Sequence, residues 1–207
     1  MFKATIIILS GDHGAGKSTI AQGIIEAYDW VNLVPQYTSR KPRNDGQETE
    51  NFFVSVDEVM QCEIVGEYRD GDGTSFMLGY RLADIEYALI NGYFPLLIGH
   101  KAIIQELRSV LPKSATVEIF LKCNKKIAAE KILKAGGSTP EKAKARLERG
   151  WESTADTRYT DYIVENNYDE STIYGVLELL RRTRMTTLPG FTMQGFHNID
   201  NLLVGRV

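Results

Sequence analysis

Residues 11–19 carry the residue types and the spacing of a loop that can bind phosphate. They read Gly-Asp-His-Gly-Ala-Gly-Lys-Ser-Thr, which matches the pattern G-x-x-x-x-G-K-S. Because glycines adopt backbone angles that other residues avoid, successive N–H groups can point inward around a phosphate. We expect Lys17 to bridge the β- and γ-phosphates of a nucleotide, and the Ser18 hydroxyl to bind Mg²⁺. The residues expected to form this nucleotide site are Gly11, Asp12, His13, Gly14, Ala15, Gly16, Lys17, Ser18 and Thr19.

The sequence on either side of this loop is that of a strand and a helix. Residues 5–9, Thr-Ile-Ile-Ile-Leu, form an apolar run, and Ile20 and Ile24 recur at helical spacing within residues 16–28. A strand, a glycine-rich turn and a helix in this order are the context of a P-loop, which binds phosphate at the helix N-terminus. A purely structural glycine turn is the alternative, and the combination of strand, spacing, lysine and serine argues against it. The loop predicts nucleotide binding without fixing the reaction.

The overall charge excludes some classes of partner. At 207 residues and a formal net charge of -3, the chain has no general attraction for nucleic acid or for an anionic membrane. Any site for an anion must therefore be a local cluster of basic groups. We expect a small-molecule phosphate acceptor as the partner, with no nucleic acid and no membrane.

The cysteines and the apolar segments favour a cytoplasmic protein. Cys62 and Cys123 are far apart in the sequence and could form at most one disulfide, and they lack the paired spacing of a zinc site. This cysteine usage fits a reducing compartment. No segment approaches the length of a membrane span, and residues 1–3 lead directly into the first expected strand without a signal-peptide pattern.

A second group of residues with possible chemistry follows the first helix. Residues 36–43, Gln-Tyr-Thr-Ser-Arg-Lys-Pro-Arg, are basic, and Pro42 makes them extended. On their own they are typical of a solvated loop. Further along, Phe52-Phe53-Val54 precedes Ser55-Val56-Asp57-Glu58, which has the pattern of a capping box at the start of a helix.

Taken in this order and spacing, the P-loop, the Thr-Ser-Arg-Lys-Pro-Arg stretch and the Phe-Phe-Val-Ser stretch resemble the guanylate kinase family. In that family, the two arginines that match Arg40 and Arg43 hold the phosphate of the acceptor GMP. The role suits their chemistry, because guanidinium groups bind phosphate oxygens in pairs and neutralise their charge. The resemblance also implies that Glu67 contacts the acceptor base and that Asn166 lies near the adenine of ATP.

The resemblance further implies a lid over the transferred phosphate. A helix expected over residues 125–133 and a charged helix that restarts at Thr139 form a pair with glycines as breaks, which is a candidate for a mobile lid. We expect the lid at residues 134–157, where Arg146 matches a lid arginine of the family. A second lid arginine of the family is replaced by Ala135, with Lys131 or Lys134 as possible substitutes.

The acceptor side departs from the family pattern. Asn51 replaces a phosphate-binding tyrosine, Tyr80 replaces a small hydroxyl residue on the base, and Leu78 replaces another tyrosine. Ile98 and His100 replace two aspartates at the end of a strand; His100 could contact the acceptor or be a strand-end residue without that role. The altered positions predict weaker guanine specificity, because discrimination depends on polar groups that the wrong ligand leaves unpaired.

Strands and helices alternate along the chain, which predicts an α/β fold with a parallel sheet and helices on both faces. We expect a single guanylate-kinase-like domain that carries an acceptor-binding lobe, a helical lid and a C-terminal extension. The expected boundaries are a core of residues 1–34, 93–124 and 158–182, a lobe of residues 35–82, a lid of residues 134–157 and an extension of residues 183–207. The extension could pack on its own domain or on a second subunit, so a homodimer is one possible state.

Three functions are compatible with these features. The first is an ATP- and Mg²⁺-dependent kinase of a nucleoside monophosphate, GMP or dGMP by resemblance, in which Lys17, Arg40, Arg43 and Arg146 are catalytic. The second is a kinase of ribose 1,5-bisphosphate, which would keep the arginines and need no base pocket. The third is a non-catalytic binding module with the same fold, and the intact P-loop argues against it.

Overall fold

Residues 6–12, 14–42, 50–69, 74–134, 144 and 160–185 are the described part of the chain in a computed structural model. Three residues of the expected site, His13, Arg43 and Arg146, lie outside these ranges. Most of the expected lid and the segment 186–207 also lie outside them.

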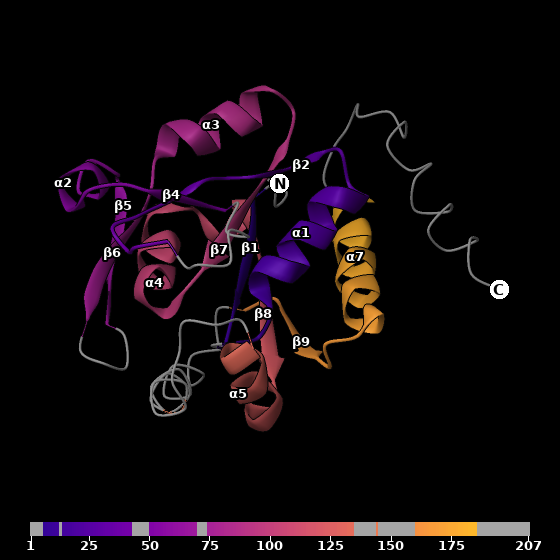
Figure 1. The fold of residues 1–207 in the computed structure, drawn as a ribbon. Coiled ribbons are helices and arrows are strands. Elements are labelled where there is room, and N and C mark those ends of the chain that lie inside the picture. The colour runs from indigo at the N-terminus through magenta and orange to yellow at the C-terminus, as the bar shows by residue number, and fades with distance from the viewer. Residues whose placement is uncertain are drawn as a thin grey trace.

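The main sheet has five parallel strands (Figure 1). Their order is β2-β7-β1-β8-β9, and every neighbouring pair is parallel. In open parallel sheets, ligands bind beyond the carboxyl ends of the strands, at the point where the strand order changes direction. The loop after β1 lies at such a point, because β2 and β8 lie on opposite sides of β1. The bounds are β1 Ile6–Gly11, β2 Val31–Leu33, β7 Phe94–Gly99, β8 Thr116–Cys123 and β9 Tyr162–Asn166.

Helices cover both faces of this sheet, as the sequence predicts. Side chains alternate across a strand, so Ile7 of β1 packs in the cluster with α1 and α7, whereas Ile8 packs in the cluster with α4. Helices α1 and α7 lie side by side in Figure 1, and the Tyr28 hydroxyl donates a hydrogen bond to the Leu177 carbonyl (2.8 Å). The helices of the core are α1 Lys17–Ala27, α3 Leu82–Ile90, α4 Lys101–Val110, the 3-10 turn η1 Lys113–Ala115, α5 Lys125–Lys134 and α7 Glu170–Met185.

A second sheet of four strands forms within residues 36–80, inside the range expected for the acceptor lobe. Its order is β4-β3-β6-β5; β3 and β4 are parallel, and the other pairs are antiparallel. The short helix α2 begins with the predicted capping box, since the Ser55 hydroxyl accepts from the Glu58 N–H and the Glu58 carboxylate accepts from the Ser55 N–H. The elements are β3 Gln36–Thr38, β4 Asn51–Phe53, α2 Val56–Val59, β5 Ile64–Arg69 and β6 Ser75–Tyr80.

The second sheet packs closely against the core. At Gly66 of β5 a side chain would not fit, because an added Cβ would lie 2.1 Å from the Ala102 carbonyl oxygen of α4.

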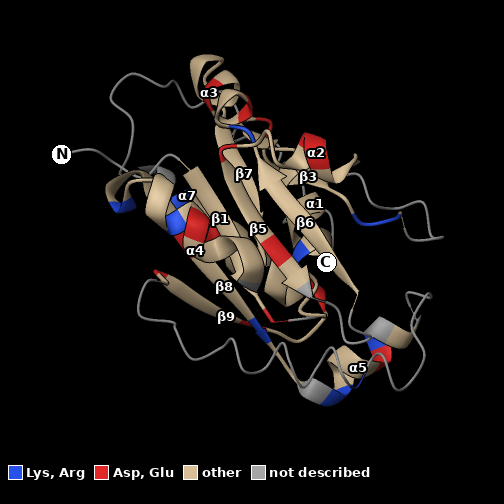
Figure 2. Cartoon of the chain, turned by 90° about the vertical axis from the view of Figure 1, so that its left-hand side faces the viewer, with Lys and Arg blue, Asp and Glu red and all other residues tan. Residues whose placement is uncertain are grey.

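Figure 2 shows basic and acidic residues mixed over the face in view, in keeping with the small net charge. Neither cysteine forms a disulfide, since both Cys62 and Cys123 are buried thiols. No helix in the described ranges is long and apolar enough to cross a membrane.

Candidate nucleotide-binding site

The loop expected to bind phosphate joins the end of β1 to the start of α1. Gly14 and Gly16 have positive φ angles of 72° and 76°, which residues with a Cβ rarely adopt. Gly16 is the N-cap of α1 and no side chain caps this helix end, so its first N–H groups face outward, where Ser18 and Thr19 are exposed. A helix N-terminus in this state is a binding site for an anion.

The first half of the loop is held against β8. The Asp12 N–H donates to the Leu121 carbonyl (3.1 Å), and the Asp12 carboxylate accepts from the Cys123 N–H (3.4 Å). An added Cβ at Gly11 would lie 2.2 Å from the Leu121 carbonyl oxygen, so only glycine allows this approach. Asp12 is 1% exposed, and its carboxylate therefore faces the protein rather than a ligand.

The second half of the loop is held by the end of β9. The Asn166 amide donates to the Ala15 carbonyl (2.7 Å) and its oxygen accepts from the Tyr168 N–H (2.7 Å), while the Tyr168 hydroxyl donates to the Gly14 carbonyl (2.6 Å). Burial raises the pKa of Tyr168, which keeps this hydroxyl a donor. The Lys131 ammonium lies 5.3 Å from the centre of the Tyr168 ring. Asn166 thus contacts the loop backbone, and Tyr168 is a second contact that the sequence analysis did not identify.

Lys17 lies across the loop. Its side chain is 8% exposed, and its ammonium donates to the Gly11 carbonyl (3.1 Å) and the Asp12 carbonyl (2.9 Å). These two carbonyls hold the Lys17 ammonium at the loop. Phosphate oxygens of a bound nucleotide can replace the carbonyls as acceptors, because their charge makes the hydrogen bond stronger.

Ser18 contacts the second sheet through a residue that the sequence analysis did not identify. The Ser18 hydroxyl donates to the Glu50 carboxylate (2.6 Å), and the Glu50 carbonyl accepts from the Gln36 N–H (2.9 Å). A hydroxyl beside a carboxylate is a set of hard oxygen donors, which suits Mg²⁺. The residues present therefore fit a magnesium ion that also binds phosphate oxygens and water. Among the described residues, no group of three or more His, Cys, Asp or Glu converges on a metal site of their own.

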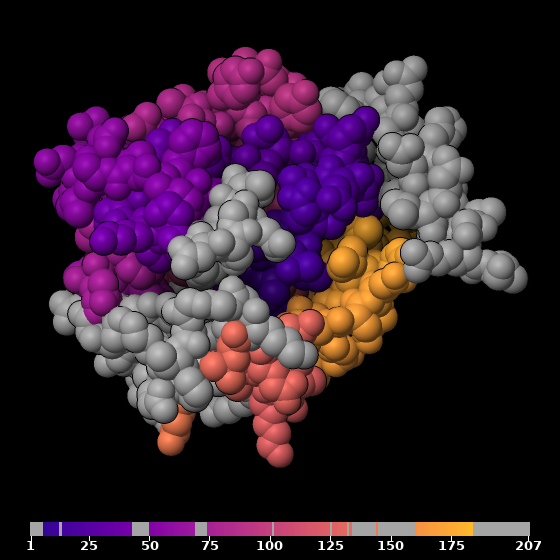
Figure 3. All heavy atoms as spheres, viewed as in Figure 1, coloured from indigo at the N-terminus to yellow at the C-terminus, as the bar shows by residue number. Residues whose placement is uncertain are grey.

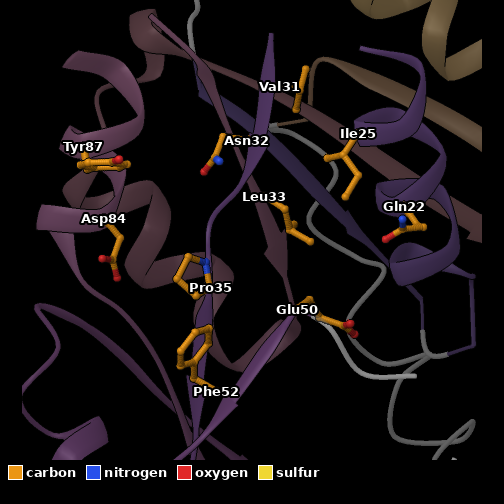
Figure 4. A pocket seen from close by; sticks show the side chains of 10 residues that line it. All are labelled: Gln22, Ile25, Val31, Asn32, Leu33, Pro35, Glu50, Phe52, Asp84 and Tyr87. Carbon is orange, nitrogen blue, oxygen red and sulfur yellow. The ribbon is translucent and has the colours of Figure 1, made fainter. Parts of the chain in front are cut away.

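Glu50 also lines an open groove of about 690 Å³ (Figure 4). Gln22 and Ile25 of α1 form one wall, and Asp84 and Tyr87 of α3 form the opposite wall. Figure 3 shows the molecule as spheres in the view of Figure 1. Helix α1 (indigo) lies there between the residues of the second sheet (purple) and α7 (yellow).

The residues expected on the acceptor side lie on the second sheet and at the end of β7. Arg40 follows β3, where its guanidinium lies 5.4 Å from the Phe53 ring centre and donates to the Lys41 carbonyl (2.9 Å). Asn51, which directly follows Glu50 in the sequence, is in β4 and pairs with Gln36 of β3. Glu67 is exposed on the edge strand β5, and His100 is the N-cap of α4.

Tyr80 has a different environment from the one expected of a residue that contacts the acceptor. It is completely buried, and its hydroxyl donates to the Ile98 carbonyl (3.0 Å) and accepts from the Ile98 N–H (3.0 Å) and the Gln36 amide (3.1 Å). The Leu96 carbonyl of β7 accepts from the Val34 N–H, on the side of β7 where β2 lies. Backbone groups two residues apart in a strand point the same way, so the N–H and carbonyl of Ile98 point to that side too. Because β2 ends at Leu33, they lie beyond its end. Tyr80 and the Gln36 amide (3.2 Å to the Ile98 carbonyl) therefore provide hydrogen bonds to backbone groups that no strand of the described ranges pairs with.

Comparison with known proteins identifies relatives along nearly the whole chain. The family model described as guanylate kinase matches residues 3–183. A guanylate kinase of Xylella fastidiosa (strain Temecula1) is 24% identical, over 88% of this chain and 90% of that protein. A guanylate kinase of Fusobacterium nucleatum is 29% identical, over 83% of this chain and 93% of that protein. The crystal structure of guanylate kinase from Anaplasma phagocytophilum is similar in fold, with a TM-score of 0.65 at 19% identity and coverage of 90% of each chain.

Proposed function

The chain belongs to the guanylate kinase family, whose members are nucleoside monophosphate kinases that use ATP and Mg²⁺, and we propose that it transfers the γ-phosphoryl group of ATP to GMP or dGMP. The observation that carries the proposal is the P-loop, in which Lys17 and the uncapped N-terminus of α1 face the same turn. A binding module would not need this lysine and serine.

We assign the transfer to positioning and charge neutralisation, because phosphoryl transfer needs no covalent nucleophile from the protein. Lys17 and the N–H groups at the start of α1 bind the donor phosphates, and Asn166 and Tyr168 fix the loop that presents those groups. When bound, Mg²⁺ supplies positive charge beside the β- and γ-phosphates. Arg40 binds the acceptor phosphate. Arg43 and Arg146, both outside the described ranges, complete the proposed set.

For the acceptor base, we propose weaker discrimination than the family pattern implies. The Tyr80 hydroxyl is committed to β7, and the Ile98 side chain is buried in the apolar core at 2% exposure. These two positions therefore supply no polar group to a guanine. We assign Glu67, which is exposed on β5, to accept hydrogen bonds from the base.

The same observation supports a second candidate acceptor. Ribose 1,5-bisphosphate has no base, so the lack of polar groups at positions 80 and 98 would not weaken its binding. Glu67 separates the two candidates, because a sugar phosphate offers this carboxylate no purine edge.

The test is the rate of ADP formation with GMP, dGMP, AMP, UMP and ribose 1,5-bisphosphate under one set of conditions, repeated with Glu67→Gln. The proposal expects GMP or dGMP to be the best acceptor, with a preference well below ten-thousandfold, and expects Glu67→Gln to reduce that preference. A larger preference would show that other residues form a full guanine site. Turnover of ribose 1,5-bisphosphate alone, unchanged in Glu67→Gln, would establish the second candidate.

A further inference from the structure

We propose that Glu50 holds the magnesium ion of the donor nucleotide together with Ser18, an inference that rests on the proposed kinase function. The contact on which it stands is the hydrogen bond from the Ser18 hydroxyl to the Glu50 carboxylate (2.6 Å). It joins the second residue of α1 to the residue immediately before β4, and so joins the P-loop to the second sheet.

The backbone of Glu50 is fixed independently of this hydrogen bond. Its carbonyl accepts from the Gln36 N–H (2.9 Å), and the next residue, Asn51, is paired with Gln36 in the ladder of β3 and β4. A hydrogen bond between two exposed side chains contributes little net stability, of the order of 1 kcal/mol. The sheet, rather than the hydroxyl of Ser18, therefore brings the Glu50 carboxylate to the P-loop.

The geometry suits a shared metal ion. Mg²⁺ binds oxygen at about 2.1 Å in an octahedral arrangement, so two neighbouring ligands lie about 3.0 Å apart. The oxygens of Ser18 and Glu50 are 2.6 Å apart and need to separate by only a few tenths of an ångström. When the hydroxyl turns its proton away from Glu50, both oxygens present lone pairs to the same point. The same position also lets Glu50 bind a water molecule of the ion.

Among the described residues, two other carboxylates near the P-loop are buried and have protein partners. The Asp12 carboxylate is buried and accepts from the Cys123 N–H. Glu118 is buried at 2% exposure and pairs with Arg108 (2.9 Å) and Ser10 (2.7 Å). The strand end of β7 supplies Ile98, which has no oxygen in its side chain, and His100. Glu50 is thus a carboxylate with an exposed contact to Ser18, at a site where a magnesium ion needs one or two carboxylates.

A different role for Glu50 predicts a change in metal affinity in the opposite direction when Glu50 is replaced. A carboxylate that only occupies Ser18 while the nucleotide is absent would compete with the metal, so its removal would strengthen metal binding. A carboxylate that holds the metal makes binding stronger, so its removal would weaken it. The direction of the change therefore distinguishes the two roles without reference to turnover.

The experiment measures the affinity of the full chain for ADP by calorimetry, with Mg²⁺ and with EDTA, and the binding of Mn²⁺ to the ADP complex by electron paramagnetic resonance. For Glu50→Gln we expect the gain in ADP affinity on adding Mg²⁺, and the Mn²⁺ affinity, to fall by roughly 10- to 100-fold. The affinity for ADP in EDTA should stay within about threefold of wild type. Glu50→Asp keeps the charge and should recover part of the loss.

A matched control is Glu26→Gln, which removes the same charge from an exposed site on α1 where Glu26 accepts from Gln22. This variant should keep the wild-type response to Mg²⁺. If Glu50→Gln, still folded by its melting temperature, responds to Mg²⁺ as wild type does or more strongly, the inference is wrong. If the wild-type protein itself binds ADP equally with and without Mg²⁺, the proposed function fails instead.

Discussion

At the scale of single residues, the proposed donor site depends on contacts that hold the backbone of the P-loop in place. Asn166 and Tyr168 bond to carbonyls of the P-loop, and Asp12 bonds the loop to β8. Lys17, the side chain proposed to act on phosphate, is itself held by two of the loop carbonyls. The loop is therefore preorganised from two sides before a nucleotide enters, which lowers the cost of ordering it on binding.

Lys17→Ala should reduce kcat about a hundredfold to a thousandfold, because the ammonium stabilises charge on the transferred group. The measurement is steady-state ADP formation, with the melting temperature as the check on folding. Turnover within a few fold of wild type in a folded variant would contradict the role of the P-loop.

Arg40→Ala should raise KM for the acceptor and lower kcat while leaving ATP affinity nearly unchanged, because the guanidinium is assigned to the acceptor phosphate. A hydrogen bond to a charged group contributes about 1.5 to 3 kcal/mol, so kcat/KM for the acceptor should fall by roughly 10- to 150-fold. ATP affinity is measured separately by calorimetry. Equal losses for ATP and acceptor would place Arg40 at the donor site instead.

Tyr168→Phe should weaken ATP binding by roughly threefold to tenfold, since it removes one hydrogen bond to the Gly14 carbonyl and leaves the ring in place. Calorimetric titration with ATP gives this number. The control is Tyr174→Phe, on an exposed part of α7. An unchanged affinity for ATP would show that Asn166 alone fixes this part of the loop.

At the scale of elements, the sequence predicted β1, α1 and the start of α2, because local signals mark these elements, whereas it did not predict the strands of the second sheet. Helix α1 begins directly after the glycine at its N-cap, and α2 begins at the Ser55–Glu58 capping box. Helix α3 begins at Leu82, directly after Arg81, whose carbonyl accepts from the Asp84 N–H.

The contacts of Glu50, Tyr80 and Tyr168 could not be predicted in the same way. They join residues far apart in the sequence, and no local pattern marks them. Tyr80 faces inward because β2 ends at Leu33 and leaves the Ile98 backbone groups without a neighbouring strand. That arrangement depends on how long a different strand is, which the residues around Tyr80 do not encode.

Tyr80→Phe should lower the melting temperature by several degrees, because it removes the acceptor of the buried Ile98 N–H, although the Ile98 carbonyl keeps a hydrogen bond from the Gln36 amide (3.2 Å). Each buried polar group left without a partner costs about 1 to 3 kcal/mol, and 1 kcal/mol corresponds to about 2 to 4 °C in a chain of this size. ATP affinity should not change. The matched control is the exposed Tyr87→Phe; equal melting temperatures for both variants would contradict the account of the β7 edge.

At the scale of the whole molecule, two sheets meet around the P-loop. The second sheet is joined to the core by the close approach of Gly66 to α4, by Tyr80 at β7 and by Glu50 at Ser18. The last of these contacts lies between the donor site and the strand that precedes α2. Ser18 therefore joins the P-loop, the proposed site of the donor phosphates, to the second sheet, which is proposed to bind the acceptor.

The measurement that tests this account most directly is the transfer of an isotopically labelled γ-phosphoryl group from ATP to GMP in the presence of Mg²⁺, followed by mass spectrometry of the products. The account predicts labelled GDP in an amount equal to the ADP formed, and about a hundredfold to a thousandfold slower formation of labelled GDP with Lys17→Ala. ADP with the label only in inorganic phosphate, for GMP and dGMP alike, would contradict it.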